Sequence, residues 1–450
     1  MAEQLRKVAV IGGNRIPFAR SNGAYIDKSN LDMLSAALEG LINRFNLQGK
    51  QVGEVVGGAV LKHSRDFNMI RECILGSKLD PKTPGYDLQQ ACDTGLQSAL
   101  VVSNKIRLGL IDSAIAGGVD STSDAPLEIG PKASSAIIKA NAAKTLGDKL
   151  KALTKISFAN FIQPPQNKEP RTGLSMGEHT AITALEWGIS REAQDELAFH
   201  SHKRLAAAYE EGFFDDLMTS YAGLTRDSNL RPDTTIEQLS KLKISFGKGT
   251  DATMTAGNST PLTDGASVVL LGTEKWAEKN NLPVDAYLTY QETAAVDFIG
   301  KTGKPEGLLM APTYAVPRML QNAGLTLQDF DFYEIHEAFA AQVLATLKAW
   351  ESPTFCKERL GLDQPLGSID MDKLNVKGSS LATGHPFAAT GGRILATAAK
   401  LLRLKGHGRA LISICAAGGQ GVVAILERNP LCGLKLNLSL IHISEPTRPY

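Results

Sequence analysis

The sequence predicts an α/β fold made of two similar halves with a segment inserted between them. Strand-like apolar runs alternate with helical patterns over most of the 450 residues. A reactive residue at a helix start, a helix, an apolar strand and a Gly-Gly turn follow one another twice, around Cys92 and around His385. The alternation is broken between residue 121 and about residue 250. A chain of this length, with 43% hydrophobic and 21% charged residues, can bury the cores of two or three domains.

Charge and cysteine usage exclude several classes of function. The 48 Lys and Arg residues nearly balance the 47 Asp and Glu residues, so no overall basic field indicates nucleic-acid binding. No apolar run approaches the roughly 18 residues that span a bilayer. The apolar run near the N-terminus is too short for a signal peptide, so we expect a cytoplasmic protein. The five cysteines form no CxxC pair, and we expect neither a disulfide framework nor a metal site.

The first half reads as alternating strands and helices. Gly12 and Gly13 follow the first strand, but the full GxGxxG spacing of a dinucleotide-binding turn is absent. Asn30 is placed to cap the first helix. Strands alternating with helices favour a largely parallel sheet. We expect strands at residues 7–11, 54–61 and 113–116, helices at residues 30–45 and 69–75, and a Gly-Gly turn at residues 117–120.

Cys92 stands where an extended run gives way to a helical one. Pro81, Pro84 and Gly85 break any helix before it, and apolar residues recur at helical spacing after it as far as residue 109. At a helix N-terminus a thiolate is stabilised relative to a thiol, which favours a nucleophile. Cysteine is also a common small core residue, and this stretch by itself slightly favours that interpretation.

The inserted segment carries a local basic patch. Between residues 131 and 171 there are eight Lys or Arg residues and two acidic ones, and two long helical patterns follow at residues 175–187 and 191–211. Leu146, Leu150 and Leu153, with lysines between them, fit a basic amphipathic helix that meets a membrane or a partner. A solvated face over an ordinary core stripe is the alternative, and the pattern modestly favours it.

The second half repeats the organisation of the first. A strand at residues 331–335 leads to His336, which we expect to open a helix. His385 precedes Pro386, which we expect to be the first residue of a helix that runs to about residue 403. Each residue taken singly also fits a structural role. If the two halves pack with their helix starts facing each other, one pocket gathers Cys92, His336, His385 and Cys415.

From residue 7 to about residue 428 the chain resembles the thiolase family. The resemblance rests on separated motifs that occur in the family's order. They are Arg15-Ile-Pro-Phe18, Gln90-Ala-Cys-Asp-Thr-Gly-Leu-Gln97, Gly117-Gly-Val-Asp-Ser121, Thr255-Ala-Gly-Asn-Ser-Thr260 with Asp264-Gly-Ala266, Gly384-His-Pro386 and Cys415-Ala-Ala-Gly-Gly-Gln-Gly421.

The resemblance implies a domain organisation. Two similar α/β halves would pack face to face in five layers, α-β-α-β-α, with a loop domain inserted in the first. The N-terminal half would comprise residues 1–122 and 251–275, and the C-terminal half residues 276–428. The loop domain, residues 123–250, would serve coenzyme A binding and contact with a partner or a membrane. Residues 429–450 resemble a translated vector sequence, and we expect them not to belong to the fold.

The resemblance also implies roles for residues at the matched positions. Cys92 would be the nucleophile that becomes acylated, His385 would take its proton and donate to one oxyanion, and Cys415 would move the proton on the acetyl-CoA carbon. The backbone N–H groups of Cys92 and Ala417 would serve the other oxyanion. His336, in the sequence His-Glu-Ala-Phe, is similar to the thiolase subunits of fatty-acid oxidation complexes and is implied to be catalytic. Implied substrate contacts are Met176, Asn258, Thr260 and Met310.

The chain departs from the family at two channel positions. Ser175 stands where the family often has His, and Thr260 where it often has Ser, so the coenzyme A contacts there are less well defined than the chemistry. The implied reaction is 3-ketoacyl-CoA and CoA giving acyl-CoA and acetyl-CoA, or the reverse condensation. Coenzyme A and acyl-CoA are substrates, and no metal or redox cofactor is expected.

The implied partners and the alternatives follow from the same likeness. A homodimer or tetramer is expected, with a hydratase/dehydrogenase subunit or a membrane surface as a further partner and no nucleic acid. A ketoacyl-carrier-protein synthase shares the fold, but it would lack a counterpart of Cys415. A non-catalytic lipid-binding subunit would have lost Cys92 or His385, and both are present.

Overall fold

The computed structural model describes residues 5–156 and 161–428, so the predicted tail at 429–450 lies outside the described residues. The N-terminal half supplies five strands and three helices before the insertion. The strands are β1 (Val8–Arg15), β2 (Ala19–Arg20), β3 (Glu54–Gly57), β4 (Gly85–Asp87) and β5 (Ser113–Asp120), and the helices are α1 (Asn30–Arg44), α2 (Met69–Gly76) and α3 (Thr94–Arg107).

The insertion and the strand that follows it come next. The insertion contains β6 (Glu128–Ile129), α4 (Pro131–Ala142), α5 (Leu146–Leu153), β7 (Ile162–Gln163), α6 (Met176–Glu186), α7 (Arg191–Glu210), α8 (Ile236–Ser240) and β8 (Ile244–Phe246). The chain then returns through β9 (Met254–Thr255) to β10 (Thr263–Gly272) and α9 (Glu274–Lys279).

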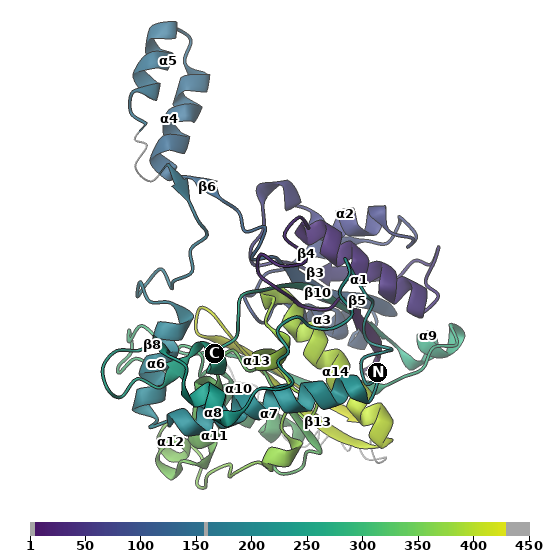
Figure 1. Ribbon diagram of the computed structural model, residues 1–450. Coiled ribbons are helices and arrows are strands. Elements are labelled where there is room, and N and C mark those ends of the chain that lie inside the picture. The colour runs from purple at the N-terminus through teal and green to yellow at the C-terminus, as the bar shows by residue number, and fades with distance from the viewer. Residues whose placement is uncertain (1–4, 157–160, 429–450) are drawn as a thin grey trace, which may run out of the picture.

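The C-terminal half repeats the strand and helix alternation. Its elements are β11 (Ala286–Ala295), α10 (Pro312–Ala323), β12 (Phe332–Ile335), α11 (Ala340–Glu351), α12 (Pro353–Glu358), α13 (Ser380–Thr383), α14 (Thr390–Lys405), β13 (Gly408–Ala416) and β14 (Gln420–Arg428). Figure 1 shows this half below the N-terminal half, with α3 and α14 between the two.

The layers follow from which strand residues face which helices. In β13 and β14, Ile412 and Ala424 face the core that holds α3 and α14, while Leu411 and Val423 face the core that holds α10 and α11. On the N-terminal half, α1 and α2 cover the outer face. This period of two along buried strands gives the predicted order α-β-α-β-α. Burying each of the three larger side chains, Ile412, Leu411 and Val423, contributes roughly 1.5–3 kcal/mol.

The sheet is mixed, and the expectation of a largely parallel sheet is wrong. Its order is β12-β13-β14-β11-β1-β10-β5-β3-β4, and the two halves join where β1 pairs with β11. The pairs β3–β4, β3–β5 and β12–β13 are parallel, and the central pairs are antiparallel. The reason is that a short hairpin joins β13 to β14, and the long insertion brings β10 back antiparallel to β5.

Two local predictions are also corrected. The cap of α1 is Ser29, whose hydroxyl accepts a hydrogen bond from the Asp32 N–H while the Asp32 carboxylate accepts from the Ser29 N–H. Asn30 is therefore the first helical residue. Pro386 is extended (ψ 100°), and α14 begins at Thr390 after a short 3₁₀ turn. Proline fixes φ but not ψ, so it starts the loop before the helix rather than the helix itself.

Candidate active site

Cys92 lies on a strained turn between β4 and α3. Ala91, immediately before it, has φ 45°, a conformation that costs a residue with a Cβ roughly 1–2 kcal/mol. The hydroxyl of Thr94 closes the turn, because it accepts from the Gln90 N–H (2.9 Å) and donates to the Ala91 carbonyl (2.7 Å). The turn leaves Cys92 half-buried, while the other described cysteines, Cys73, Cys356 and Cys415, are buried.

His385 contacts the sulfur of Cys92 from the other half of the molecule. Its Nε2 lies 3.1 Å from Cys92 Sγ, and its Nδ1 lies 2.6 Å from the hydroxyl of Thr390. The N-terminal half holds the loop that carries it. The Asp120 carboxylate accepts from the Ala388 N–H (2.8 Å), and the Thr263 hydroxyl accepts from the His385 N–H (3.2 Å).

Burial keeps the thiol and the imidazole neutral in the resting site. Burial and the Asp93 carboxyl raise the pKa of Cys92 to about 12, although the N–H groups of Ala417 and of Cys92 itself oppose the shift. Burial and the charge of Arg393 lower the pKa of His385 to about 3. The expected stabilisation of a resting thiolate by the helix N-terminus is therefore wrong. The helix begins two residues later, at Thr94, and desolvation outweighs its dipole.

Cys415 is the second-last residue of β13 and is 1% exposed. A three-residue turn, with Gly418 and Gly419 at φ 80° and 71°, joins β13 to β14. Burial raises the pKa of Cys415 well above its usual value, and the charges of Cys92 and Asp93 add to that rise. The two thiols are therefore close enough to influence each other. The Ala417 N–H in the same turn is directed at the sulfur of Cys92.

The inserted segment contacts this turn through Glu169. The Gly418 N–H donates to Glu169 Oε1 (2.7 Å), and Glu169 is buried. Glu169 belongs to the loop that precedes α6. In this loop, Thr172 Oγ1 lies 2.7 Å from Nε2 of His179 on α6. The insertion therefore fixes one peptide of the turn that follows Cys415.

His336 follows β12 directly, and its ring packs against that of His385 at a tilt of 46°. The ring centroids are 4.2 Å apart, and His336 Nδ1 lies 2.8 Å from the hydroxyl of Ser380. His336 is fully buried. Helix α11 begins at Ala340, so His336 precedes that helix in a loop rather than opening it.

The four predicted substrate contacts fall into two groups. Met310 belongs to the apolar cluster that contains Cys415, and Met176 packs against that cluster. Thr260 donates to the Ala338 carbonyl (3.0 Å), next to the loop that carries His336. Asn258 is fully buried, and its amide bonds to Asp195, to the Thr253 carbonyl and to the Thr255 N–H, so its polar atoms are held inside the protein.

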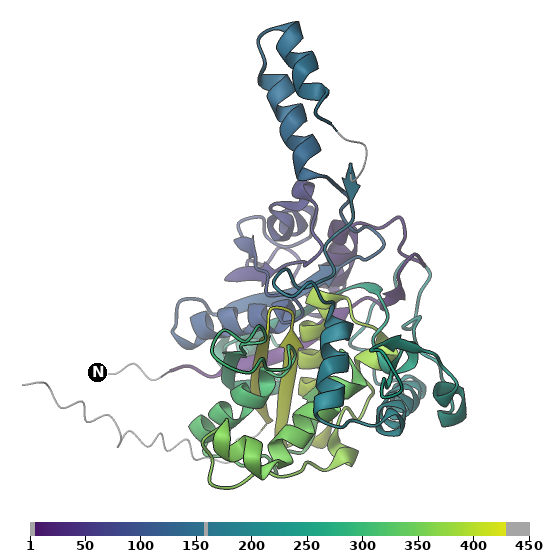
Figure 2. The same cartoon turned by 90° about the vertical axis from the view of Figure 1, so that its left-hand side faces the viewer.

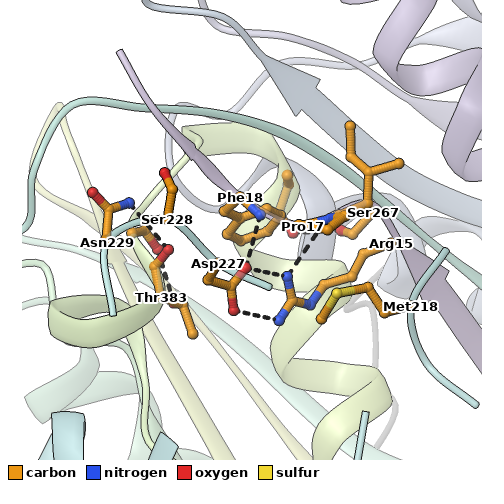
Figure 3. A network of polar contacts seen from close by, with 12 residues as sticks. Arg15, Pro17, Phe18, Met218, Asp227, Ser228, Asn229, Ser267 and Thr383 are labelled. Atoms are coloured by element: carbon orange, nitrogen blue, oxygen red, sulfur yellow. Dashed lines mark hydrogen bonds and ion pairs between the residues drawn. The ribbon is translucent and has the colours of Figure 1, made fainter. Parts of the chain in front are cut away.

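A buried ion pair connects the insertion to the loop before His385. Arg15 donates to both carboxylate oxygens of Asp227, at 2.6 and 2.7 Å, and both side chains are almost completely buried. Figure 3 shows Asp227 between Arg15 and the Phe18 N–H, with Asn229 reaching the Thr383 carbonyl. Arg15 therefore holds Asp227 in place, and the same chain segment contacts the loop before His385 through Asn229.

Sequence reasoning missed the side chains that support the site. Thr390 lies five residues after His385, so a search for a hydroxyl close to that histidine in the sequence would have found it. Ser380 lies 44 residues from His336, and no local pattern links the two. Arg393 follows both in the sequence. No local pattern marks Glu169, which reaches the site only through tertiary folding. Within residues 5–156 and 161–428 there is no group of three or more His, Cys, Asp or Glu residues placed to hold a metal ion. None of the helices in those ranges could cross a membrane.

Comparison with known proteins agrees with this arrangement. The pattern described as the thiolase N-terminal domain matches residues 8–275, and that of the thiolase C-terminal domain matches residues 290–428. The 3-ketoacyl-CoA thiolase of Vibrio cholerae is 39% identical over 428 residues, which are 94% of this chain and 97% of that protein. The 3-ketoacyl-CoA thiolase of Yersinia pestis is 38% identical over the same share of each chain.

Solved structures agree as well. The crystal structure of human mitochondrial 3-ketoacyl-CoA thiolase matches with a TM-score of 0.77 and 27% identity, covering 94% of this chain and all of that one. The acetyl-CoA acetyltransferase of Bacillus anthracis matches with a TM-score of 0.77 and 26% identity, covering 95% of this chain and all of that one. The two domain matches and the relatives of nearly equal length show that this chain belongs to the thiolase family of acyltransferases.

Proposed function

We propose that the protein cleaves 3-ketoacyl-CoA with coenzyme A, giving acetyl-CoA and a shortened acyl-CoA, through an acyl-enzyme on Cys92. The observation that carries this proposal is the 3.1 Å contact between Cys92 Sγ and His385 Nε2, with the Ala417 N–H directed at the same sulfur. Nucleophile, base and oxyanion donor converge on one atom, as acyl transfer requires. The names of the relatives support the same substrate class.

The first half of the reaction forms the acyl-enzyme. As the Cys92 sulfur attacks the 3-keto carbon, its proton passes to Nε2 of His385. The developing alkoxide accepts hydrogen bonds from the N–H groups of Cys92 and Ala417. The bond between C2 and C3 then breaks, and Cys415 protonates C2, which releases acetyl-CoA. The protonated His385 stabilises the enolate oxygen that appears on the acetyl-CoA side.

The second half returns the acyl group to coenzyme A. The Cys415 thiolate takes the proton of the incoming coenzyme A thiol, whose sulfur attacks the Cys92 thioester. Cys92 leaves as the proton on His385 returns to it, so both cysteines end as thiols. Their raised pKa values fit these roles, because both must be protonated at rest. The steps need no metal or redox cofactor.

The apolar cluster around Cys415 bears on which acyl chain lengths the protein accepts. Met176 and Met310 lie with Cys415 in one apolar cluster, which supports their predicted place along the substrate channel. Steady-state thiolysis should be measured with 3-ketoacyl-CoAs of increasing length. We expect turnover with at least one of them. The proposed reaction would be overturned if the enzyme turned over none of these substrates although an acyl-CoA still acylated Cys92.

The inserted segment is also proposed to hold a docking element, formed by α4 and α5. This hairpin stands away from the body of the molecule (Figures 1 and 2). Leu146, Leu150 and Leu153 on α5 are exposed, and no residue of that helix is buried. Lysines surround the apolar side chains. Those that line the space between the two helices are Lys132, Lys139, Lys151 and Lys155.

An apolar stripe among lysines suits an anionic membrane surface. Replacing Leu150 and Leu153 by Ser should abolish co-sedimentation with vesicles that contain anionic lipid and should leave thiolysis unchanged. Exposed Ile182 and Leu185 on α6 offer a matched control, since their replacement by Ser should leave sedimentation unaltered. Loss of a homodimer, a tetramer or a larger assembly, measured by light scattering, would identify a protein partner instead.

A further inference from the structure

The two adjacent imidazoles of the site, His385 and His336, differ in what their Nε2 atoms contact. Each ring has its Nδ1 beside a hydroxyl, that of Thr390 for His385 and that of Ser380 for His336. Nε2 of His385 meets the sulfur of Cys92. Nε2 of His336 is buried and has no hydrogen-bond partner within the described residues. A fully buried ring nitrogen without a partner, beside the base of the reaction, requires an explanation.

Arg393 determines where the proton of the Ser380 hydroxyl points. A guanidinium group only donates hydrogen bonds, and Nη2 of Arg393 donates to Ser380 Oγ (3.0 Å). The hydroxyl therefore accepts from Arg393, and its own proton needs another acceptor. Within the described residues, the acceptor that Ser380 Oγ meets is Nδ1 of His336, at 2.8 Å.

This arrangement fixes the tautomer of His336. If Nδ1 accepts the Ser380 proton, a neutral ring carries its own proton on Nε2. The opposite tautomer would leave both a hydroxyl proton and a ring lone pair unpaired in a buried place, which costs more. Burial, with the charges of His385 and Arg393, lowers the pKa of His336 well below its usual value, so the ring is neutral.

Arg393 itself remains charged at neutral pH. Burial lowers its pKa to about 10, and the carboxyls of Glu334 and Glu337 oppose that shift. Arg393 also donates to Ser379 Oγ (3.2 Å). Within the described residues, this hydroxyl makes no hydrogen bond to His336 or His385. The guanidinium therefore remains a permanent donor behind the two rings.

We propose that Arg393 and Ser380 are positioning residues that hold His336 as its Nε2–H tautomer, so that the ring donates a hydrogen bond to the enolate oxygen of acetyl-CoA. This inference rests on the proposed function. It gives the two adjacent rings different roles: His385 gains and loses the Cys92 proton, while His336 keeps its proton and only donates a hydrogen bond. A donor already oriented toward developing charge costs no reorganisation during the reaction.

The first test observes the tautomer directly. With ¹⁵N-labelled histidine, the ring nitrogen signals of His336, assigned by their loss in His336→Gln, should show a protonated Nε2 and a bare Nδ1. In Ser380→Ala, these signals should move toward those of the other tautomer. In Ser379→Ala, the matched control, they should not move. A protonated Nδ1 in the unaltered enzyme would overturn the inference and leave the proposed reaction intact.

The second test uses kinetics on the same variants. Ser380→Ala should lower kcat for thiolysis about tenfold with little change in KM, because the lost interaction belongs to the transition state. Ser379→Ala should retain full kcat. Thermal unfolding establishes that both variants are folded. Unchanged kcat in His336→Ala, which removes the donor, would refute the catalytic role of His336, and with it this inference, whereas failure of the proposed reaction would appear as no thiolysis by the unaltered enzyme.

Discussion

Cys92 and Cys415 are the same residue type in contrasting surroundings, one contributed by each half of the molecule. Cys92 is half-buried on a strained turn and has an imidazole 3.1 Å from its sulfur. Cys415 is almost fully buried in an apolar cluster at the end of an unstrained strand. The two thiols still influence each other's protonation. The difference teaches that exposure and a paired base, rather than the thiol itself, select which cysteine attacks a substrate.

The largest expected effect separates the two cysteines by partial reaction. Cys92→Ala should abolish thiolysis, condensation and acetyl exchange between acetyl-CoA and free CoA, because every step passes through its thioester. Cys415→Ala should lose thiolysis by about 10²–10⁴-fold, the usual contribution of a positioned acid or base. It should still take an acetyl group, because that exchange moves no proton on carbon and needs Cys415 only at the sulfur of coenzyme A, whose thiolate is itself a good leaving group.

Intact-protein mass after incubation with acetyl-CoA, together with label exchange into free CoA, measures these outcomes. The roles assigned to the cysteines are wrong if folded Cys415→Ala cannot be acetylated, or if Cys92→Ala still exchanges. Cys356→Ala offers a matched control, since Cys356 is also buried but lies on α12, where its thiol contacts the carbonyls of Ala349 and Trp350 on α11.

The second effect concerns the pH dependence of alkylation. Since the pKa of Cys92 is raised to about 12 and that of His385 is lowered to about 3, the resting pair is neutral. The thiolate fraction then increases about tenfold per pH unit below that pKa. The rate of iodoacetamide labelling at Cys92 should therefore rise throughout pH 6–9 without a plateau, and Cys415 should stay unlabelled. A plateau in that range would indicate a thiolate–imidazolium pair.

The sequence allowed much of this site to be predicted, because the reactive residues stand at glycine-bounded ends of periodic segments. Cys92, His336, His385 and Cys415 do lie together, as two halves with facing helix starts require. Strand and helix positions were also predicted, with boundaries that differ by a few residues. The periodicity of apolar residues predicts which face of a helix or strand is buried, and the same face is buried in the folded protein.

The ionisation of the site and the pairing of the sheet could not be predicted in the same way. Local sequence places Cys92 near a helix dipole, but it does not report the desolvation that dominates its pKa. Strand direction depends on how far the insertion carries the chain before β10 returns to β5. Arg393 looks like an ordinary basic residue in a helical pattern, and only tertiary packing shows that its charge is buried behind the histidines.

The third effect tests whether the strained backbone of Ala91 contributes to catalysis by positioning Cys92. Ala91→Val should lower the free energy of unfolding by about 1–2 kcal/mol, since a branched side chain is poorly tolerated at positive φ. It should also reduce thiolysis about tenfold by displacing the nucleophile, an effect of the size expected from a small misplacement. Ala91→Gly should change stability by less than about 1 kcal/mol, because relief of strain offsets chain entropy.

Ala222 supplies the control for that experiment. It also has φ 45°, in an exposed turn. Ala222→Val should destabilise the protein to a similar degree and leave thiolysis unchanged. Thermal or denaturant unfolding and steady-state kinetics measure both quantities. Equal losses of activity in the two valine variants would show that the strain at Ala91 has no particular role in catalysis.

The smallest effect concerns the turn that follows Cys415. Glu169 is the acceptor for the Gly418 N–H, next to the Ala417 N–H, which is directed at the Cys92 sulfur and is the proposed oxyanion donor. Glu169→Ala should free this glycine turn and slow catalysis about fivefold, the equivalent of about 1 kcal/mol of barrier. Glu169→Gln keeps an oxygen acceptor and should retain most of the activity.

Glu169→Ala sharpens the comparison between the cysteines, because it alters the turn that follows Cys415 and is expected to affect the reaction at Cys92. The donor of Ala417 stabilises the oxyanion in every attack at the Cys92 acyl group, so Glu169→Ala should slow acetyl exchange and thiolysis by the same factor. Loss of Cys415 should slow thiolysis far more than exchange. If Glu169→Ala slowed thiolysis and left exchange at its original rate, Glu169 would act on the carbon acid step through Cys415. The Gly418 contact would then support the second cysteine rather than the oxyanion site of the first.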